Sequence, residues 1–264
     1  MGLLQYSSYI SSLVVLCSLL LKPSCSLNPK SSQNEEWKSA IVTWYGKKTG
    51  AGSDRGACEY GAVVENSPLS KMVTAVGRTL YDEGRGCGAC YQMKCTENVE
   101  CSGNPITVVT TDECKTCSDK DHFDLSGTAF GALAKPGKAD NLRHAGRLQV
   151  KYTRVACQFG TNIALKVGSG SNPYYFSLVV EYENDNSNLA AVHLKQAQPS
   201  DSWVSMKRDR GAVWILNSSS PLRAPLSVKL AEASGETIVA ENVIPADWKP
   251  GNTYHSSVNF KNSV

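Results

Sequence analysis

The amino-acid sequence predicts an all-β protein of two domains, and three observations carry that prediction. The last eight of the ten cysteines lie between Cys58 and Cys157, whereas residues 158–264 contain none. Runs rich in β-branched residues, typical of strands, occur on both sides of that limit. In the second half they recur at intervals of about 8–12 residues, which is typical of a β-sandwich. We therefore expect a disulfide-bonded β domain followed by a sandwich that depends on its hydrophobic core.

Residues 1–26 are expected to be a cleaved secretory signal peptide. The apolar run Ile10–Leu21 is too short to span a bilayer, which needs about 20 apolar residues, and the small residues of Ser24–Ser26 follow it. Cleavage removes Cys17 and Cys25 and leaves eight cysteines, an even number for an oxidising compartment. We therefore expect a secreted protein with structural disulfides and no membrane span.

The predicted elements of the first half are strands at 106–111 and 148–155 and a short helix at 125–134, which Pro136 ends. Residues 168–173, rich in glycine and serine, are expected to link the two halves. The predicted strands of the second half are 176–182, 190–195, 203–206, 212–216, 226–230 and 237–243.

The composition excludes two classes of protein. A hydrophobic fraction of 41% and a charged fraction of 19% are typical of a folded chain and not of a disordered one. A net charge of +3 is too small to indicate a nucleic-acid-binding protein.

The cysteine spacing allows two functional interpretations besides disulfides. Cys87 and Cys90, with Cys114 and Cys117, form a pair of C-x-x-C motifs that could hold zinc. The gap between the motifs is long, four other cysteines stay unexplained, and secretion favours oxidation. The Cys90 neighbourhood also matches papain-like proteases, but no histidine stands where their base is expected. We therefore expect structural disulfides, no metal and no cofactor.

Four polar segments suggest a carbohydrate site, because sugars stack on aromatic rings and carboxylates accept their hydroxyl groups or act as acid and base. Each also has a structural explanation: Asp124 could cap a helix, Asp112 could hold a turn, and Trp44 and His122 could belong to the core. The residues alone leave these alternatives open. The four segments are Thr43–Gly46, Thr111–Asp112, His122–Asp124 and His144–Arg147.

Taken together, the motifs resemble the expansins, and within them the β-expansins related to grass-pollen group-1 allergens. The resemblance extends from about Thr43 to Tyr254 in the order of the family. Its motifs are Thr43–Gly46, Gly56–Cys58, Gly84–Tyr91, Cys101–Gly103, His122–Gly127 and Gly211–Trp214.

This resemblance implies a six-stranded double-ψ β-barrel, similar to family-45 glycoside hydrolases, followed by an immunoglobulin-like carbohydrate-binding β-sandwich. The implied boundaries are 27–54 for a segment leading into the barrel, 55–162 for the barrel, 163–173 for a linker and 174–258 for the sandwich. The implied disulfides are Cys58–Cys87, Cys90–Cys157 and Cys95–Cys101, with Cys114 and Cys117 as the remaining pair.

The resemblance also implies a function: a secreted, monomeric protein that loosens the plant cell wall by disturbing non-covalent contacts between cellulose and matrix glycans such as xylan. Asp124 matches the catalytic acid of the related hydrolases, whereas their base has no counterpart, so no hydrolysis is expected. The implied polysaccharide groove comprises Thr43, Trp44, Tyr45, Asp54, Asp112, His122 and Asp124, and the second-domain sugar surface comprises Tyr175 and Arg210.

Two other functions remain as alternatives. The chain could be a glycoside hydrolase that uses Asp124 as acid and Asp112 or Asp54 as base, or a purely carbohydrate-binding protein. Three positions depart from the family pattern: Arg55 and Glu59 replace glycines, and Arg210 replaces a frequent tryptophan. Asn217 begins an Asn-Ser-Ser sequon and is the expected glycosylation site.

Overall fold

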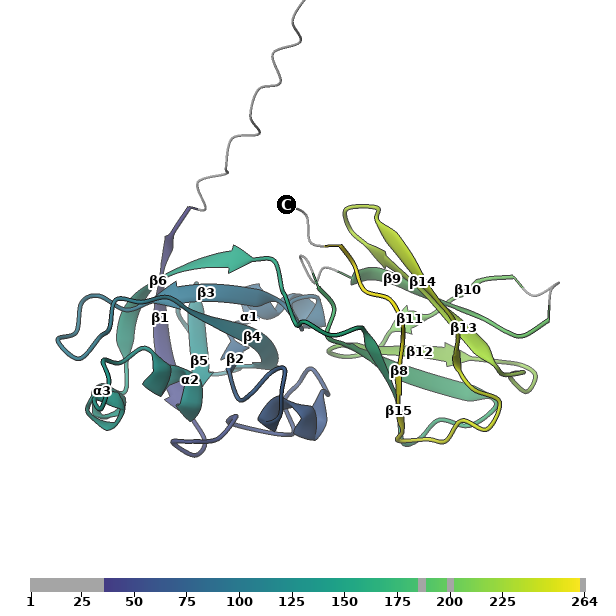
Figure 1. The fold of residues 1–264 in the computed structure, drawn as a ribbon, viewed down its shortest axis with the longest axis horizontal. Helices are drawn as coiled ribbons and strands as arrows, with labels where there is room; N and C mark the ends of the chain where they lie inside the picture. Colours follow the sequence, from purple (N-terminus) through teal and green to yellow (C-terminus); the bar gives the residue numbers. More distant parts are fainter. Residues whose placement is uncertain (1–35, 185–188, 199–201, 262–264) are drawn as a thin grey trace, which may run out of the picture. The chain divides into compact units, whose positions relative to one another are not determined.

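The computed structural model describes residues 36–184, 189–198 and 202–261, so the expected signal peptide lies outside the described residues. The described chain forms a closed β-barrel and then a two-layered β-sandwich, which belong to one compact unit (Figure 1). This all-β architecture confirms the predicted fold class. Within the described part, no helix is long and apolar enough to cross a membrane.

Six strands close the barrel in the order β1-β5-β2-β4-β3-β6. The pairs β1–β5 and β2–β4 are parallel, and the other neighbours are antiparallel. Two parallel pairs inside an otherwise antiparallel closed barrel agree with the double-ψ arrangement. The strands are β1 (Lys38–Tyr45), β2 (Val73–Val76), β3 (Cys90–Lys94), β4 (Ile106–Glu113), β5 (His122–Ser126) and β6 (Leu148–Val155).

Alternation along the strands decides which side chains enter the barrel core. On β5, Phe123 and Leu125 are fully buried, and His122 and Asp124 point to the other side. Phe123 packs edge-on against Tyr152 and Tyr91, at ring-centroid distances of 4.9 and 5.1 Å. An aromatic cluster from three strands therefore fills the barrel and leaves the alternate positions of β5 for polar residues.

The helices of the first half are short: α1 (Arg78–Tyr81), α2 (Gly127–Ala132) and α3 (Ala139–Ala145), with 3-10 turns η1 (Gly61–Glu65) and η2 (Asp82–Gly84). The predicted helix at 125–134 was wrong at its start, because Leu125 belongs to β5. The hydroxyl of Ser126, not the Asp124 carboxylate, caps α2 by accepting the Ala129 N–H at 3.0 Å. Asp124 is thereby left on a strand, with its carboxylate available for other contacts.

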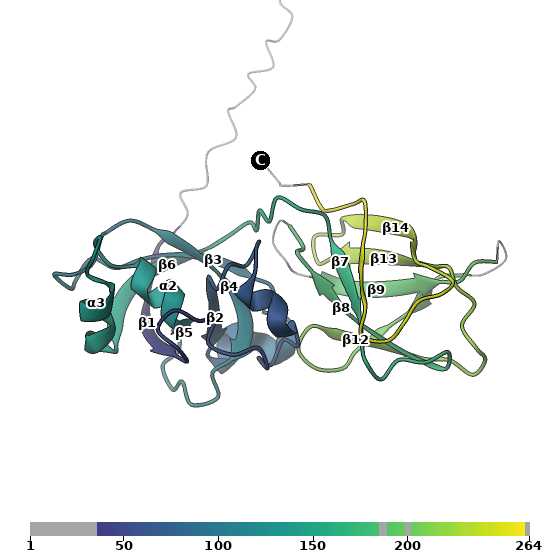
Figure 2. The same ribbon diagram turned by 60° about the horizontal axis from the view of Figure 1, so that its bottom comes forward.

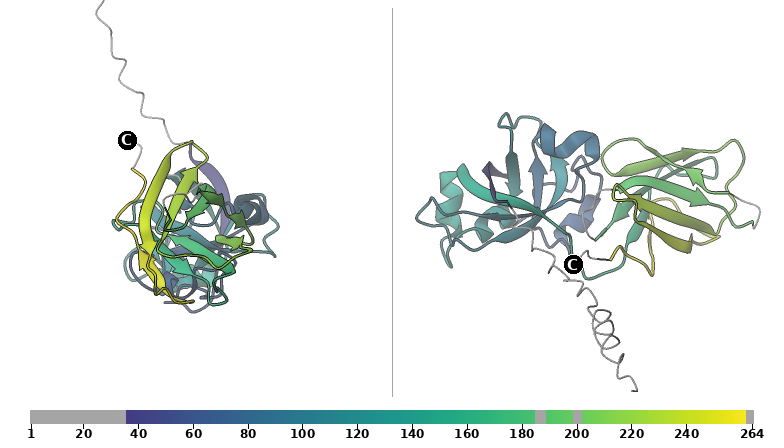
Figure 3. Two further views of the ribbon diagram at one scale, coloured as in Figure 1. Left: turned by 90° about the vertical axis from the view of Figure 1, so that its right-hand side faces the viewer. Right: turned by 90° about the horizontal axis from the view of Figure 1, so that it is seen from above.

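The second half forms a four-stranded sheet, β10-β9-β13-β14, and a five-stranded sheet, β11-β12-β8-β7-β15 (Figures 2 and 3). Phe176, Leu178 and Leu226 are fully buried in the core between them. The strands are β7 (Ala164–Val167), β8 (Tyr175–Glu181), β9 (Leu189–Lys195), β10 (Val204–Ser205), β11 (Lys207–Arg208), β12 (Val213–Asn217), β13 (Leu226–Glu232), β14 (Thr237–Ile244) and β15 (Thr253–His255).

Two expected boundaries differ from the structure. The barrel starts before residue 55, because β1 pairs with both β5 and β6 and the barrel cannot close without it. The expected linker 163–173 contains β7, which pairs with β8, so its Gly- and Ser-rich part is a turn between two sandwich strands. The connection between the domains is therefore the shorter stretch 156–163 between β6 and β7.

Four disulfides lie in the barrel half. They join Cys58 to Cys87, Cys90 to Cys157, Cys95 to Cys101, and Cys114 to Cys117. Chain-entropy arguments give about 4 kcal/mol for a bond that closes a long loop and about 2 kcal/mol for the shortest loops. Cys90–Cys157, which spans 67 residues, therefore contributes most to global stability, whereas Cys114–Cys117 only constrains the β4–β5 loop.

The barrel-facing side of the five-stranded sheet contacts the barrel directly. Val179 and Val213 pack into the barrel core, although they lie on sandwich strands. Gly84 and Gly211 bring their backbones so close that a Cβ on Gly84 would lie 2.5 Å from the Gly211 carbonyl oxygen. The Arg208 guanidinium donates to the Gly211 and Gly84 carbonyl oxygens, at 3.2 and 3.4 Å. Glycine is required at both positions of this contact.

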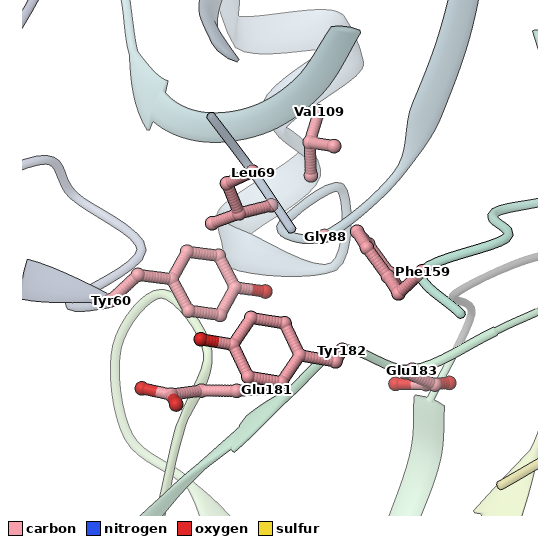
Figure 4. Close-up of a pocket in the computed structure, with 8 residues that line it drawn as sticks. All are labelled: Tyr60, Leu69, Gly88, Val109, Phe159, Glu181, Tyr182 and Glu183. Atoms are coloured by element: carbon pink, nitrogen blue, oxygen red, sulfur yellow. The ribbon is translucent and has the colours of Figure 1, made fainter. Parts of the chain in front are cut away.

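A small pocket of about 20 Å³, enough for one water molecule, is lined by residues of both the barrel and the sandwich. Figure 4 shows Tyr60 and Tyr182 in the pocket with Glu181 on one side of their rings and Glu183 on the other. Glu181 is 1% exposed, and neither of its carboxylate oxygens has a hydrogen-bond partner among the described residues. Burial raises the pKa of Glu181 to about 7, and the nearby Lys166 ammonium opposes that rise only in part.

We expect this carboxyl group to make stability depend on pH. Below the unfolded-state pKa of about 4.5 the carboxyl group is neutral in both the folded and the unfolded state, so its ionisation does not lower the free energy of unfolding. As the pH rises through 7 it ionises in the folded protein, and stability is lost by about 3 kcal/mol. Chemical denaturation of wild type and Glu181→Gln should therefore show the wild type losing about 3 kcal/mol relative to the variant between pH 4.5 and pH 8. A constant difference across that range would contradict the assignment.

Candidate functional site

A row of four residues crosses neighbouring barrel strands and brings two carboxylates to one side. Thr43 on β1 is paired with Asp124 on β5, and Asp124 is paired with Ala75 on β2. Ala75 is in turn paired with Asp112 on β4. Two strand spacings separate the aspartates, so their Cα atoms lie about 9.5 Å apart. The small side chain of Ala75, which is 3% exposed, stands between the two aspartates in this row.

A chain of hydrogen bonds connects Asp124 to a surface arginine. The Thr43 hydroxyl donates to Asp124 Oδ1 at 2.5 Å and also contacts His122 Nε2 at 3.0 Å. The other ring nitrogen, Nδ1, lies 3.1 Å from Asp119 Oδ2. Arg147 Nη2 donates to both Asp119 oxygens, at 3.1 and 2.9 Å, and this hydrogen bonding lowers the Asp119 pKa. The buried His122 ring is therefore held at both nitrogens.

These contacts fix the order of the groups along the chain. Ionised Asp119 can only accept, so His122 Nδ1 carries a hydrogen. The single hydroxyl of Thr43 contacts both His122 Nε2 and Asp124 Oδ1, and it therefore links the imidazole ring to the carboxyl group.

The surroundings of Asp124 raise its pKa above the ordinary value of an aspartate. Burial raises its pKa, and the hydrogen bond from Thr43 and the charge of His122 oppose this, whereas Asp112 adds to it. Tyr45, on the same side of β1, has a buried hydroxyl that lies beside Asp112, and a hydrogen bond to that carboxylate contributes to its raised pKa. Burial and the charges of Asp112 and Asp124 raise the Tyr45 pKa, so its hydroxyl stays a donor beside the carboxylates.

Asp112 has a structural task that Asp124 lacks. Its Oδ1 accepts the backbone N–H groups of Ala57 at 2.7 Å and Glu113 at 2.8 Å. A Cβ on Gly56 would lie 2.4 Å from the Thr111 carbonyl oxygen, so only glycine lets the 56–58 turn approach. One oxygen of Asp112 is thus committed to holding this turn, next to Cys58 and its disulfide.

Two expected groove residues make their contacts elsewhere. The Trp44 indole N–H donates to the Arg143 carbonyl at 3.1 Å, and its ring lies 6.4 Å from that of Phe130, against α2 and α3. Strand alternation turns it away from Thr43 and Tyr45. Asp54 is exposed in the loop after β1 and, within the described chain, makes no hydrogen bond or ion pair with the aspartates of the row.

The second-domain candidates lie on the barrel-facing sheet and the turn beside it. Tyr175 begins β8 and is partly exposed, and Arg210 precedes Gly211 in the turn between β11 and β12. Arg210 Nε donates to Glu59 Oε1 of the barrel at 3.0 Å. Two departures from the family pattern, Glu59 and Arg210, therefore form an ion pair with each other. Asn217 is exposed at the end of β12.

Among the described residues, no cluster of histidine, cysteine, aspartate or glutamate side chains is arranged to hold a metal ion. The acidic row and its hydrogen-bond chain therefore consist of ordinary acid, hydroxyl and imidazole groups.

Comparisons with known proteins decide the family. One family model, described as the expansin C-terminal domain, matches residues 163–245, and another, described as lytic transglycolase, matches residues 73–152. The chain is 48% identical to putative expansin-B2 of Arabidopsis thaliana over 97% of each chain. It is 52% identical to expansin-B4 of the same plant over 84% of this chain and 87% of that protein. The chain belongs to the β-expansins, a branch of the expansin family.

A solved structure has the same fold. A point mutant of the Clavibacter michiganensis expansin, in complex with cellohexaose, superimposes with a TM-score of 0.67 at 23% identity. The match covers 87% of this β-expansin and all of that chain. The architecture of a barrel followed by a sandwich is thus shared with a bacterial expansin despite the low identity.

Two residues that sequence reasoning missed, Asp119 and Ala75, shape the surroundings of the acid in this β-expansin. Asp119 orients His122 together with Arg147 of the predicted polar segment His144–Arg147, and Ala75 separates the two aspartates. Asp119 stands three residues before His122, but nothing in that spacing indicates a contact outside a helix. Ala75 is an ordinary alanine in a buried strand, and only the order of the barrel strands places it between the carboxylates.

We expect Thr43→Val to raise the Asp124 pKa above its wild-type value, because the Thr43 hydroxyl donates to the ionised carboxylate and lowers that pKa. The carboxyl ¹³C shift of Asp124, followed by NMR against pH, measures the change. Thr107→Val, at an exposed β4 position, is the matched control and should leave the titration unmoved. An unchanged or lowered Asp124 pKa in Thr43→Val would contradict the hydrogen bond from the Thr43 hydroxyl to the Asp124 carboxylate.

Proposed function

We propose that this β-expansin is secreted and loosens the plant cell wall by disrupting hydrogen bonds between cellulose and matrix glycans, without hydrolysing them. The observation that carries the proposal is the unequal pair of aspartates. Burial raises the Asp124 pKa and so enlarges its protonated fraction at a given pH, and Thr43 links Asp124 to His122, whereas Asp112 is held by two backbone N–H groups. The site thus offers one proton donor.

Protonated Asp124 can donate a hydrogen bond to a glycan oxygen that would otherwise bond to a neighbouring chain. The Tyr45 hydroxyl, next to the carboxylates, supplies a second donor. Thr43 holds the Asp124 carboxyl group in place while this hydrogen bond forms, and His122 in turn contacts the Thr43 hydroxyl. Each step exchanges one hydrogen bond for another, so glycan chains can slip past each other while their covalent bonds stay intact.

The hydrolase alternative lacks a suitable base. Inverting hydrolysis needs a second carboxylate about 6.5–9.5 Å from the acid, free to activate a water molecule. Asp112 lies at a compatible backbone distance, but one of its oxygens is occupied by the 56–58 turn. Asp54, the other candidate base, lies in an exposed loop and has no contact with the row in the described chain.

Other features support an extracellular polysaccharide-binding role. Four disulfides suit an oxidising compartment. Exposed Asn217 is accessible to a glycan-attaching enzyme, and Tyr175 offers a ring to a sugar face. The structural neighbour crystallised with cellohexaose supports a β-linked glucan chain as ligand. We propose cellulose, xylan or other matrix glycans as partners of a monomeric protein.

We expect wild-type protein to induce creep of isolated, heat-inactivated plant cell walls under constant load. Creep should grow as the pH falls, because the protonated fraction of Asp124 grows. Asp124→Asn should reduce creep about ten-fold, because an amide N–H is a weaker donor than a carboxylic O–H, and a ten-fold change corresponds to about 1.4 kcal/mol. The variant should also lose most of the pH dependence. Asp247→Asn, at an exposed position after β14 in the sandwich, is the matched control and should behave as wild type.

The same walls distinguish the alternatives. Sustained release of reducing sugar by wild type, lost in Asp124→Asn, would establish hydrolysis and overturn the non-hydrolytic proposal. Wall binding without creep at any pH would assign the protein a binding role only.

A further inference from the structure

The Cys114–Cys117 disulfide differs from the other three disulfides in its access to solvent. Cys117 is partly exposed, whereas the other seven bonded cysteines are buried. Its neighbours Thr116 and Ser118 are exposed as well, so this side of the bond lies at the surface. Because thiol–disulfide exchange begins when a thiolate reaches one of the two sulfur atoms, an external thiol reaches this bond before the others.

A second short disulfide, Cys95–Cys101, shows that loop length alone does not create this access. Its sequence separation is 6 residues, against 3 for Cys114–Cys117. Its two cysteines, however, are only 1% and 6% exposed. The two bonds are thus similar in span and different in exposure, which makes Cys95–Cys101 an internal control.

The surroundings of the bond indicate how it would open. Cys117 is the accessible sulfur, so buried Cys114 becomes the leaving thiolate. The Thr116 hydroxyl lies 3.8 Å from Cys114 Sγ, and it is the donor of this contact because a disulfide sulfur carries no hydrogen. A hydrogen bond to a thiolate lowers the pKa of the thiol, and a thiol of lower pKa leaves faster.

The fold is expected to survive the opening of this bond. The stabilisation that a disulfide gives grows with the length of the loop it closes, and this loop is the shortest of the four. The Cys114 N–H donates to the Val76 carbonyl at 2.8 Å, so the end of β4 stays attached to β2 without the disulfide. The effect of reduction is therefore confined to the following loop, residues 115–121.

The same loop carries Asp119, which holds part of the candidate site. Asp119 stands two residues after Cys117 and accepts from His122 Nδ1 and from Arg147. The Cys117 N–H donates to the Cys114 carbonyl at 3.3 Å, within the ring that the disulfide closes. When this ring opens, Asp119 loses the fixed point beside it, and its hold on His122 weakens.

We propose that the Cys114–Cys117 bond is a redox-exchange site, which a dithiol reduces reversibly in the folded protein, and that its reduction releases the loop that holds His122. The exchange itself goes beyond the proposed function, and only its effect on wall creep rests on that function.

The exchange proceeds in two balanced steps. One thiolate of the dithiol attacks Cys117 Sγ, the S–S bond breaks, and Cys114 leaves as a thiolate that takes up a proton from water. The second thiolate of the dithiol then attacks the first sulfur of the dithiol in the mixed disulfide and releases Cys117, which is protonated in the same way. The dithiol is oxidised to a disulfide, and the two cysteines are reduced to thiols.

The first test determines which disulfide of the native protein opens first. The protein is incubated with dithiothreitol at neutral pH, free thiols are trapped by alkylation at intervals, and the labelled peptides are identified by mass spectrometry. Cys114 and Cys117 should be labelled about ten-fold faster than Cys95 and Cys101, while circular dichroism shows an unchanged fold. Equal rates, or slower labelling of Cys114 and Cys117, would overturn the inference.

A variant tests the assignment of the leaving sulfur. Thr116→Val should slow the reduction of Cys114–Cys117 several-fold, because it removes the hydroxyl beside Cys114 Sγ. Ser118→Ala, at an exposed position of the same loop, is the matched control and should leave the rate unchanged. An unchanged rate in Thr116→Val would contradict Cys114 as the leaving sulfur.

A second reductant distinguishes the source of the dithiol. A protein dithiol of the thioredoxin type is compared with dithiothreitol at the same dithiol concentration. Faster reduction by the protein assigns the exchange to a protein partner, and slower reduction assigns it to small dithiols. Both results support the exchange site, whereas reduction by neither would overturn it.

The next test measures whether reduction releases the loop. In selectively reduced protein and in the double variant Cys114→Ser/Cys117→Ser, amide hydrogen exchange should accelerate at position 117. It should stay slow at position 114, whose N–H donates to Val76. The His122 imidazole ¹⁵N shifts should move as the Asp119 contact weakens, and reoxidation should restore them. Unchanged exchange and unchanged His122 shifts after reduction would overturn the release of the loop.

Wall creep separates this inference from the proposed function. After the reductant is removed, creep should be several-fold lower with reduced protein than with oxidised protein, and reoxidation should restore it. Equal creep with both forms would overturn the link between the loop and the acid. Absence of creep with oxidised protein counts against the proposed function, whereas thiol labelling and hydrogen exchange still decide whether the bond is a redox site.

Discussion

The parallel pairing of β1 with β5 is the constraint on which the candidate site depends. It sets Thr43 beside Asp124 and turns His122 toward the same hydroxyl, although about 80 residues separate β1 from β5. Phe123 and Leu125, the alternate residues of β5, fix that register because they are fully buried in the barrel. A slip of one residue would bury the carboxylate and expose two core side chains, so hydrophobic packing also orients the acid.

The two domains obtain their stability in different ways, and their contact shows the consequence. Polar residues occupy some strand positions of the barrel, and four disulfides cross-link it. The described sandwich is instead stabilised by a hydrophobic core that contains Phe176, Leu178, Leu226 and their neighbours. Where they meet, Val179 and Val213 pack into the barrel core beside the buried carboxyl group of Glu181. That contact is close because Gly84 and Gly211 lack side chains, and it creates the cleft that Arg210 and Glu59 border.

Several features could be predicted from the sequence because they depend on neighbouring residues. Alternating β-branched runs predicted β4, β6 and most sandwich strands, and the cysteine distribution predicted where covalent cross-links concentrate. Local rules failed where a distant contact overrides propensity. Leu125 continues a strand because β1 and β2 pair with β5 on both sides, and the glycine-rich stretch at 168–173 is a turn because β7 pairs with β8.

By itself, the sequence determined the all-β class, the two domains and the family, and it singled out Asp124 as a candidate, since each is expressed in residue types and their order. Only the tertiary structure decided that Asp119 and Arg147 orient His122, that Ala75 separates the two aspartates, and that Glu59 meets Arg210. Apart from the contact of Asp119 with His122, three positions away, these relations arise from strand order and domain packing, which join residues from about 30 to 150 positions apart. No local pattern encodes such contacts, because their energy is gained only when the barrel closes and the sandwich docks on it.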